Sequence, residues 1–331
     1  MWNILQCAVQ GQSHIKTDVP CQDKTFFYNE GDVSITALAD GAGSAKLSHY
    51  GAEHITQYIC NDLSVNFELY FNNNDGVAVK RELDSKIKNQ ISQLAKELKC
   101  ESKDLSSTLL VAAVKADQYI LIHIGDGVIG YTKKNEIKIA SKPENGEFVN
   151  TTVFTTSMDS LVSMKLMKGK LGDVDGFILM SDGSEASLYN KRENTLASVL
   201  LRIAHMTEYI PLHKVQVQLT ESFESVIRSA TTDDCSISIM VNNYNRFSGY
   251  RQIMPYEKRQ LFKIGNGNNR SDKQYKRMDQ IVLFLEEPHS LFEISRHIHL
   301  KPKYTRKYLY KLINLNLIER KRNTYQTIII F

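Results

Sequence analysis

The stretch Ser34-Ile-Thr-Ala-Leu-Ala-Asp-Gly-Ala-Gly-Ser44 joins a run of apolar, strand-forming residues to an acidic turn that contains glycine. Asp40 follows the apolar run directly, as Asp126 follows LIHIG and Asp182 follows FILMS farther along the chain. An aspartate at the end of a buried strand is held by a rigid scaffold while it faces a cleft. These repeated strand ends predict a sheet protein that presents carboxylates to a ligand.

Short segments with strand character surround these motifs over the first 240 or so residues, and helical periodicity is confined to a few longer blocks. The strands are expected at 2–9, 34–39, 108–115, 119–124, 127–133, 136–140, 151–156, 176–181 and 235–242, and the helices at 51–63, 76–98, 194–205 and 212–229. The tight turn at 115–119 favours antiparallel pairing. The fold class is therefore α+β, with two antiparallel sheets covered by helices.

Two more acidic motifs, Cys21-Gln22-Asp23 and the segment 232–236 with Asp233 and Asp234, complete a set of five. A single Asp-Gly pair is more often a tight turn than a ligand, since both residues tolerate a positive φ. Five such motifs are hard to explain as turns alone, and clustered carboxylates repel one another unless cations bind between them. Oxygen ligands without His or Cys select hard cations such as Mg²⁺ or Mn²⁺.

The order of these motifs resembles that of the protein phosphatase 2C family, over about residues 1–242. The matching segments are QD (22–23), ADGAGS (39–44), STLL (107–110), GDG (125–127), SDGSEA (181–186) and DDCSIS (233–238). The segments GQSH, PCQD and ADGAGSA are similar to a bacterial branch of the family. The resemblance implies a β-sandwich flanked by helices that hydrolyses phosphoserine and phosphothreonine in proteins.

The resemblance also implies a site for two ions of Mn²⁺ or Mg²⁺, with a third, weaker ion beside them. Asp40 would bridge the two ions with help from the Gly41 carbonyl, Asp182 and Asp233 would each bind one of them, and Asp126 would hold the third. The implied metal ligands are Asp23, Asp40, Gly41, Asp126, Asp182 and Asp233, of which Asp40, Asp182 and Asp233 are catalytic. Two such ions lower the pKa of a bridging water, which attacks phosphorus in line.

Two positions depart from the family pattern. Ala42 stands where eukaryotic members commonly have a histidine, so the general acid is not identified. The phosphate-binding arginine before the QD motif is also missing, and the basic residues available nearby are His14 and Lys16. We expect one of them to bind phosphate, although a capping histidine and a solvated surface lysine are the simpler alternatives.

A polar, glycine-bearing stretch over 243–272 reads as a linker, and a different pattern begins at residue 273. Lys273–Phe331 carries a local charge of +7, against −3 for the rest of the chain. Three expected helices (275–287, 291–299, 303–315) and two strands resemble a winged helix-turn-helix. Basic residues at its third helix and wing would contact DNA phosphates: Lys303, Arg306, Lys307, Arg320, Lys321 and Arg322. Winged helices also serve as protein-docking modules.

These observations predict a metal-dependent protein-serine/threonine phosphatase whose small basic domain localises or regulates it. One alternative is a DNA-binding regulator with a phosphatase-like sensor domain, and another is a phosphatase for a small phosphorylated molecule. The N-terminus lacks the basic and apolar regions of a secretory signal, and no apolar run is long enough to span a bilayer, so a cytoplasmic location is expected. The sequence indicates no oligomeric state.

Overall fold

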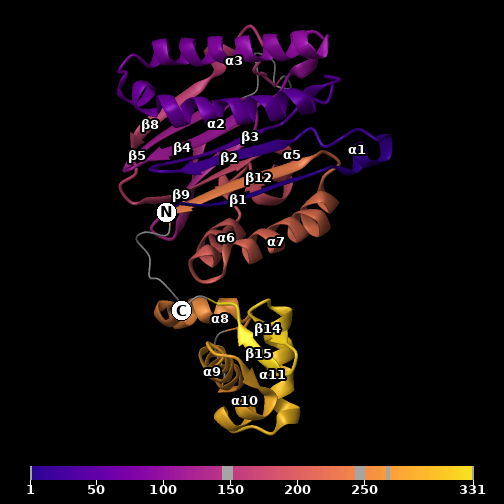
Figure 1. Ribbon diagram of the computed structural model, residues 1–331, viewed down its shortest axis with the longest axis vertical. Coiled ribbons are helices and arrows are strands. Elements are labelled where there is room, and N and C mark those ends of the chain that lie inside the picture. Colours follow the sequence, from indigo (N-terminus) through magenta and orange to yellow (C-terminus); the bar gives the residue numbers. More distant parts are fainter. Residues whose placement is uncertain (1, 144–151, 243–249, 266–268, 330–331) are drawn as a thin grey trace. The chain divides into compact units, whose positions relative to one another are not determined.

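The computed structural model describes residues 2–143, 152–242, 250–265 and 269–329 (Figure 1). The chain forms two compact units, Met1–Ala204 with Gln216–Tyr244, and His205–Val215 with Asn245–Phe331. No helix in the described ranges has the length and apolarity needed to cross a membrane.

Two five-stranded sheets, in which every neighbouring pair of strands is antiparallel, form the first unit. In spatial order, the first sheet contains β1 (Trp2–Val9), β12 (Cys235–Asn242), β9 (Val174–Met180), β6 (Val128–Lys133) and β7 (Glu136–Ser141). The second contains β2 (Lys24–Glu30), β3 (Val33–Ala39), β4 (Leu109–Lys115), β5 (Gln118–Ile124) and β8 (Lys165–Lys170). The predicted α+β fold with two antiparallel sheets is confirmed.

Side chains alternate between two cores along the central strands of the second sheet, because successive residues of a strand point to opposite faces. Leu38 and Leu110 pack between the two sheets, with Phe177 of the first sheet. Ile35 and Val111 belong to the other core, which lies under the helices. These central strands are buried on both faces, so most of their residues are apolar and form nearly continuous hydrophobic runs.

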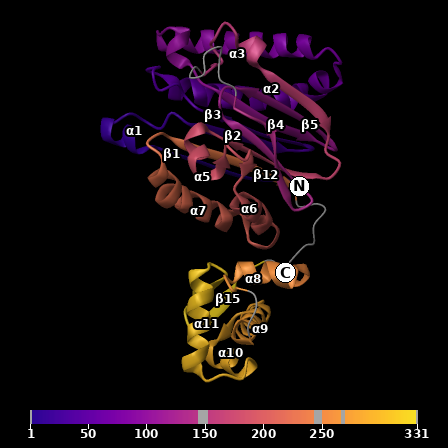
Figure 2. The same ribbon diagram turned by 180° about the vertical axis from the view of Figure 1, so that it is seen from behind.

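Two long helices, α2 (Ser48–Asn72) and α3 (Gly76–Leu98), cover the outer face of the second sheet (Figures 1 and 2). The predicted helix 76–98 has the bounds of α3, and its buried residues Val79, Leu83, Ile87 and Ile91 follow the expected spacing of three and four. The predicted helix 51–63 lies within α2, which continues for nine more residues beyond it. In this arrangement the ends of several strands lie at the same end of the β-sandwich.

Two expectations for this unit were incomplete. Residues 152–156 form no strand, although 151–156 was predicted as one. The strands β2 and β8 were not predicted, because both lie at sheet edges and carry several polar residues that break the apolar pattern.

The remaining elements of the chain up to residue 230 are α1 (Gln12–Thr17), η1 (Ser102–Leu105), α4 (Ser160–Ser163), α5 (Asp182–Leu188), β10 (Tyr189–Asn190), β11 (Thr195–Leu196), α6 (Ser198–Tyr209), α7 (Leu212–Ser222), η2 (Phe223–Ile227) and η3 (Arg228–Ala230).

The C-terminal part of the second unit consists of short helices with a small antiparallel sheet, ordered β13-β15-β14. Its elements are η4 (Tyr250–Gln252), α8 (Pro255–Leu261), α9 (Asn269–Phe284), β13 (His289–Ser290), α10 (Leu291–His297), α11 (Pro302–Asn314), β14 (Ile318–Lys321) and β15 (Thr324–Thr327). Ser290 and Glu293 form the capping box expected from the sequence, and Pro302 opens α11. The winged-helix assignment itself stays a prediction.

The stretch 243–272 is more than a linker, because it contains α8 and the first turn of α9. Pro255 begins α8, and Glu257 accepts a hydrogen bond from the Met254 backbone N–H at 3.0 Å. Phe262 is fully buried just after the helix. A capped start and one buried aromatic side chain suffice for this short helix, whereas the polar composition of the stretch indicated a loop. Residues 243–249 and 266–268 lie outside the described ranges.

Candidate active site

Antiparallel pairing places three of the predicted site residues at the same end of the second sheet, where strands begin or end. Lys24 of β2 pairs with Ala39 of β3, so Asp23 and Asp40 lie beside each other where these strands begin and end. Asp126 follows the end of β5, which reaches the same edge because β4 runs antiparallel to both β3 and β5. Residues separated by more than 80 positions in the chain thus lie at the same end of the sheet.

The first sheet supplies the other two carboxylates in the same way. Met180 of β9 pairs with Ile237 of β12, so the end of β9 lies next to the beginning of β12. Asp182 follows β9 as the first residue of α5, and Asp233 lies two residues before β12. Both sheets of the sandwich therefore contribute acidic residues to the candidate site.

Asp40 and Asp182 lie close to each other, one from each sheet, so that each affects the pKa of the other. Burial is the main cause that raises the pKa of Asp40 well above its ordinary value, with contributions from the charges of Asp23, Asp182 and Asp233. Burial and then the charge of Asp126 raise the pKa of Asp182. Carboxylates that disfavour one another's ionisation are close enough to share a cation.

Hydrogen bonds that involve backbone groups and one hydroxyl hold the turn at Asp40 in place against the rest of its sheet. The Asp40 backbone N–H donates to the Thr108 hydroxyl at 2.9 Å, and the Thr108 backbone N–H donates to the Asp40 carbonyl at 2.8 Å. Gly41 donates its N–H to the Gln22 carbonyl at 3.2 Å. These contacts explain structurally why the STLL segment accompanies the acidic motifs.

Asp23 is a buried carboxylate with unmatched oxygen atoms. It is 1% exposed, and neither of its carboxylate oxygens has a hydrogen-bond partner among the described residues. Burial raises its pKa to about 7, although the nearby Ser236 and Ser181 side chains oppose this shift. Asp182 Oδ1 is likewise buried and without a partner in the part of the chain that the structure describes. Such orphaned oxygens suit a hard divalent cation.

The predicted ligand set is nevertheless not assembled around one point. Within residues 2–143, 152–242, 250–265 and 269–329, no three His, Cys, Asp or Glu side chains are arranged to hold a metal ion. The chemistry of the donors fits Mn²⁺ or Mg²⁺, while the assignment of each residue to an ion stays a prediction.

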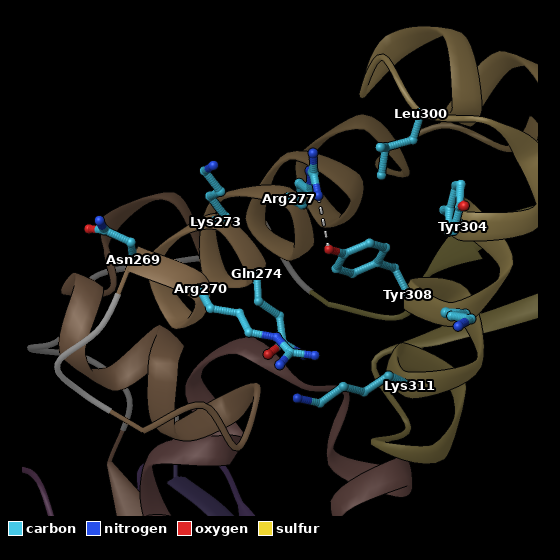
Figure 3. Close-up of a pocket in the computed structure, with 10 residues that line it drawn as sticks. Asn269, Arg270, Lys273, Gln274, Arg277, Leu300, Tyr304, Tyr308 and Lys311 are labelled. Atoms are coloured by element: carbon cyan, nitrogen blue, oxygen red, sulfur yellow. Dashed lines mark hydrogen bonds between the residues drawn. The ribbon is translucent and has the colours of Figure 1, made fainter.

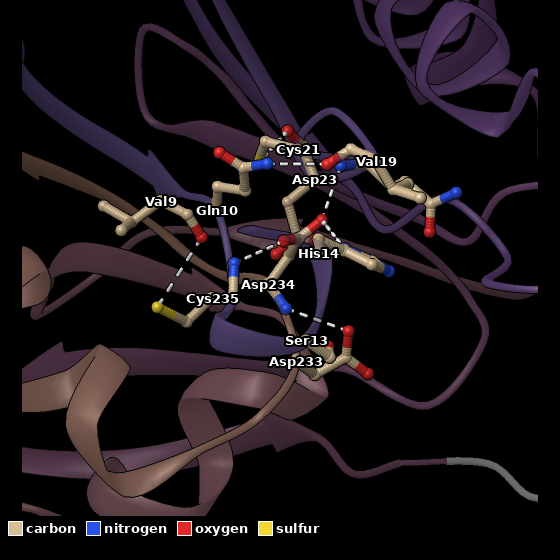
Figure 4. Close-up of polar contacts among 12 residues, drawn as sticks. Val9, Gln10, Ser13, His14, Val19, Cys21, Asp23, Asp233, Asp234 and Cys235 are labelled. Atoms are coloured by element: carbon tan, nitrogen blue, oxygen red, sulfur yellow. Dashed lines mark hydrogen bonds and ion pairs between the residues drawn. The ribbon is translucent and has the colours of Figure 1, made fainter. Parts of the chain in front are cut away.

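Asp234 differs from its neighbour Asp233, since its carboxylate is fully engaged with the N-terminal segment (Figure 4). It accepts the backbone N–H groups of Gly11 at 2.6 Å and Gln22 at 2.5 Å, and His14 Nδ1 lies 2.9 Å from its Oδ2. Asp233 is exposed, and its Oδ1 accepts the Asp234 backbone N–H at 2.8 Å. The Asp234 carboxylate is thus occupied by structural contacts, and the assignment of Asp233 as the metal ligand stays a prediction.

Two glycines allow three backbone segments to meet here. A Cβ atom on Gly183 would lie 1.9 Å from the Asp234 carbonyl oxygen, and one on Gly11 would lie 2.3 Å from the carbonyl carbon of Asp233. No other residue would fit at either position without moving the backbone.

Of the two predicted phosphate ligands, His14 lies in α1 and is held by Asp234, with its side chain 15% exposed. Lys16 is exposed on the same short helix, and no ion pair involves it among the described residues. The sequence reasoning did not single out Glu185, which is 2% exposed and pairs with Lys191 at 2.6 Å. Burial raises the pKa of Glu185, as do Asp182 and Asp126 to a smaller extent. Its position three residues after Asp182 was the available signal.

Comparison with known families decides the family of this arrangement. The family model for protein phosphatase 2C matches residues 10–223. The chain belongs to the protein phosphatase 2C family. The family resemblance drawn from the motifs is thereby confirmed, as is the predicted enzyme class, a protein-serine/threonine phosphatase.

A curated phosphatase and two solved bacterial phosphatase structures are also similar to this chain. Serine/threonine-protein phosphatase 3 of Escherichia coli (strain K12) is 25% identical in an alignment of 211 positions that covers 59% of this chain and 78% of that protein. A crystal structure of a bacterial serine phosphatase has a TM-score of 0.51 at 16% identity, covering 75% of this chain and 100% of that one. Serine/threonine phosphatase Stp1 from Staphylococcus aureus has a TM-score of 0.50 at 16% identity, with 73% and 95% covered. The two structures support the fold.

Proposed function

We propose that this protein is a metal-dependent phosphatase that hydrolyses phosphoserine and phosphothreonine in proteins with Mn²⁺ or Mg²⁺. The observation that carries the proposal is the group of carboxylates that meet at one end of the sandwich, with buried and unpartnered oxygens on Asp23 and Asp182 among the described residues. In a structural role such groups would be paired, since an uncompensated buried charge is costly. A cytoplasmic location stays a prediction beside this proposal.

The family pattern suggests which ion each metal ligand would bind. Asp40, with the Gly41 carbonyl, would hold two ions together, and Asp182 and Asp233 would each hold one of them, with Asp126 at a third. When bound, the ions would supply positive charge that polarises the phosphoryl oxygens and lowers the pKa of water. The chain's own part is to fix these carboxylates through the Asp40 turn and the Asp182 helix start, and to exclude bulk water from Asp23.

His14 and Lys16 are the proposed phosphate contacts. A histidine whose Nδ1 lies next to a buried carboxylate, as that of His14 lies 2.9 Å from Asp234 Oδ2, can present its other ring nitrogen to an anion. Lys16 lies two residues farther along the same exposed helix, where its flexible side chain can approach a phosphoryl group.

Phosphate release from phosphoserine and phosphothreonine peptides tests the proposal. We expect activity in the presence of Mn²⁺, none with a chelator, and a loss of at least 100-fold in Asp40→Asn and Asp182→Asn. Asp117→Asn is the matched control, because this aspartate is exposed in the turn between β4 and β5, at the opposite end of the strands from Asp40, and pairs with Lys170. Activity on small phosphate esters alone would favour the small-molecule alternative. A folded protein without activity in any divalent metal would favour the regulator.

A second candidate function is DNA binding by the C-terminal elements. Lys303, Arg306 and Lys307 are exposed on α11, and 320–322, which contains three basic residues, is exposed at the β14–β15 hairpin. The charge of +7 over Lys273–Phe331 supports contact with a polyanion. A salt-sensitive shift of duplex DNA that survives Asp40→Asn but is lost in Arg306→Gln with Lys307→Gln is expected. No shift at low salt would refute it.

A further inference from the structure

A pocket of about 770 Å³ lies between α9 and α11, lined by residues of these helices and by Leu300 (Figure 3). Its lining is basic and aromatic, and it contains no acidic residue. The basic lining residues are Arg270, Lys273, Arg277, Lys307 and Lys311. The volume is in the range of sites that bind small molecules, which is roughly 300–1,000 Å³.

The positive charge of this pocket is not neutralised from within. None of its five basic side chains has an ion-pair partner in the part of the chain that the structure describes. Lysines and arginines of the preceding helix α8, by contrast, are paired: Lys258 with Asp279 at 3.1 Å, and Arg259 with Asp272. Partial burial lowers the pKa of Lys311, and no carboxylate offsets that cost. Like charges gathered in a concave site favour a bound anion.

Two tyrosines give the pocket a second kind of contact. Tyr304 and Tyr308 are four residues apart on α11, so their rings lie on the same side of the helix. Tyr308 Oη accepts a hydrogen bond from Arg277 Nη1 at 3.3 Å, which orients the guanidinium at the pocket wall. Tyr304 is 50% exposed and offers a ring face on which a planar group can stack.

The pocket uses a different side of α11 from the predicted DNA surface. At about 100° per residue, Tyr304, Tyr308 and Lys311 share one side of the helix, while Lys303 and Arg306 lie on another. The buried residues Thr305, Leu309 and Leu312 form the third side. Lys307 lies between the pocket side and the exposed side, so the two surfaces can be changed separately through the other residues.

We propose that this pocket binds a nucleoside di- or triphosphate, with its phosphates on the basic residues of α9 and α11 and its base against the Tyr304 ring. Five unpaired cations match several phosphate charges better than one, and the tyrosine supplies the stacking surface that a base requires. A concave pocket between two helices encloses a small molecule, whereas a DNA duplex is read by an element that projects into its groove.

Calorimetric titration of the full chain with ATP, AMP and adenosine tests the proposal, in the presence of a chelator so that no metal-dependent site contributes. We expect ATP to bind more tightly than AMP, adenosine to bind least, and the affinity for ATP to fall as salt is raised. Lys273→Gln with Arg277→Gln should weaken ATP binding by at least 10-fold. Lys303→Gln with Arg306→Gln removes the same charge from the other side of α11 and should leave it within about twofold.

Arg277 contacts Tyr308, so a second double variant, Arg270→Gln with Lys273→Gln, changes only exposed side chains and should also lose affinity. Absence of ATP binding to the folded wild type would overturn the proposal. Equal losses in the pocket and control variants would also overturn it, because they would indicate non-specific attraction. If duplex DNA rather than ATP bound through Lys273 and Arg277, the pocket would be part of a nucleic-acid surface and the nucleotide assignment would be wrong.

Discussion

Asp233 and Asp234 are adjacent in the chain, yet their side chains have different surroundings. Asp234 is 2% exposed and accepts two backbone N–H groups from the N-terminal segment, while Asp233 remains exposed at the sheet edge. The motif alone was enough to predict Asp233, and not Asp234, as the metal ligand. The hydrogen bonds that Asp234 accepts could not be predicted, because its partners Gly11 and Gln22 lie more than 200 residues away in the sequence.

His123 provides a prediction at the scale of one residue. It is 1% exposed, its Nδ1 lies 2.6 Å from Ser141 Oγ, and its Nε2 lies 2.9 Å from the Gly125 carbonyl oxygen. Burial, with a smaller effect of the Lys165 charge, lowers its pKa from 6.5 to about 4. The unfolded chain then binds a proton that the folded chain does not, so the stability linked to His123 is complete above pH 6.5 and is lost as the pH falls toward 4.

Urea unfolding of the wild type and of His123→Gln at pH 7.5 and pH 5 measures this linkage. Between these pH values the wild type should lose about 2 kcal/mol more of its unfolding free energy than the variant does. The comparison with the variant is needed because the buried aspartates with raised pKa values act in the opposite direction. Parallel pH dependences of the two proteins would show that His123 is not the titrating group.

At the scale of an element, α3 depends on a cap that the sequence places at its first turn. The Asp75 side chain accepts the backbone N–H groups of Val77 and Ala78, both at 3.0 Å. Asp75→Ala removes both hydrogen bonds and should lower the unfolding free energy by about 1 kcal/mol. Asp75→Asn should retain most of the stabilisation that the cap provides, because its side-chain oxygen can still accept hydrogen bonds. Chemical denaturation of the three proteins measures the effect. Equal losses in both variants would indicate that charge, and not capping, is what Asp75 contributes.

The elements themselves were predictable to different degrees. The strands β3, β4, β5, β9 and β12 are largely buried on both faces and rich in apolar residues, and α3 has a regular buried stripe, so the sequence pattern indicated them correctly. The edge strands β2 and β8 exist because β3 and β5 offer unpaired backbone groups at their outer sides. That requirement comes from a neighbour in space and leaves little trace in the local sequence.

For the whole molecule, the main expectation is that a divalent ion stabilises the fold. The apo form holds several carboxylates that disfavour one another's charge, as the raised pKa values of Asp23, Asp40 and Asp182 show. Mn²⁺ at 100 times its dissociation constant should therefore stabilise the wild type by about 2.7 kcal/mol and raise its melting temperature. In Asp40→Asn the shift should disappear, although this variant should be no less stable than the wild type without metal.

Differential scanning calorimetry with Mn²⁺ and with a chelator provides the measurement, and Asp117→Asn serves again as the exposed control. An equal shift in Asp40→Asn and the wild type would place the ion elsewhere. This readout is independent of catalysis, so it separates a failure of metal binding from a failure of the phosphatase assignment.

The family and the α+β class could be predicted from the amino-acid sequence, as could the acidic candidates for the site, because strand-forming runs and the motifs that follow them are local properties of the chain. That Asp40 lies close to Asp182, that Asp234 binds the N-terminal segment and that Glu185 is buried near Asp182 follows only from the tertiary structure. The basic pocket also arises only in three dimensions, since α9 and α11 contribute its two walls from segments about 30 residues apart. Burial and contact depend on which strands and helices become neighbours, and chain periodicity does not encode that choice.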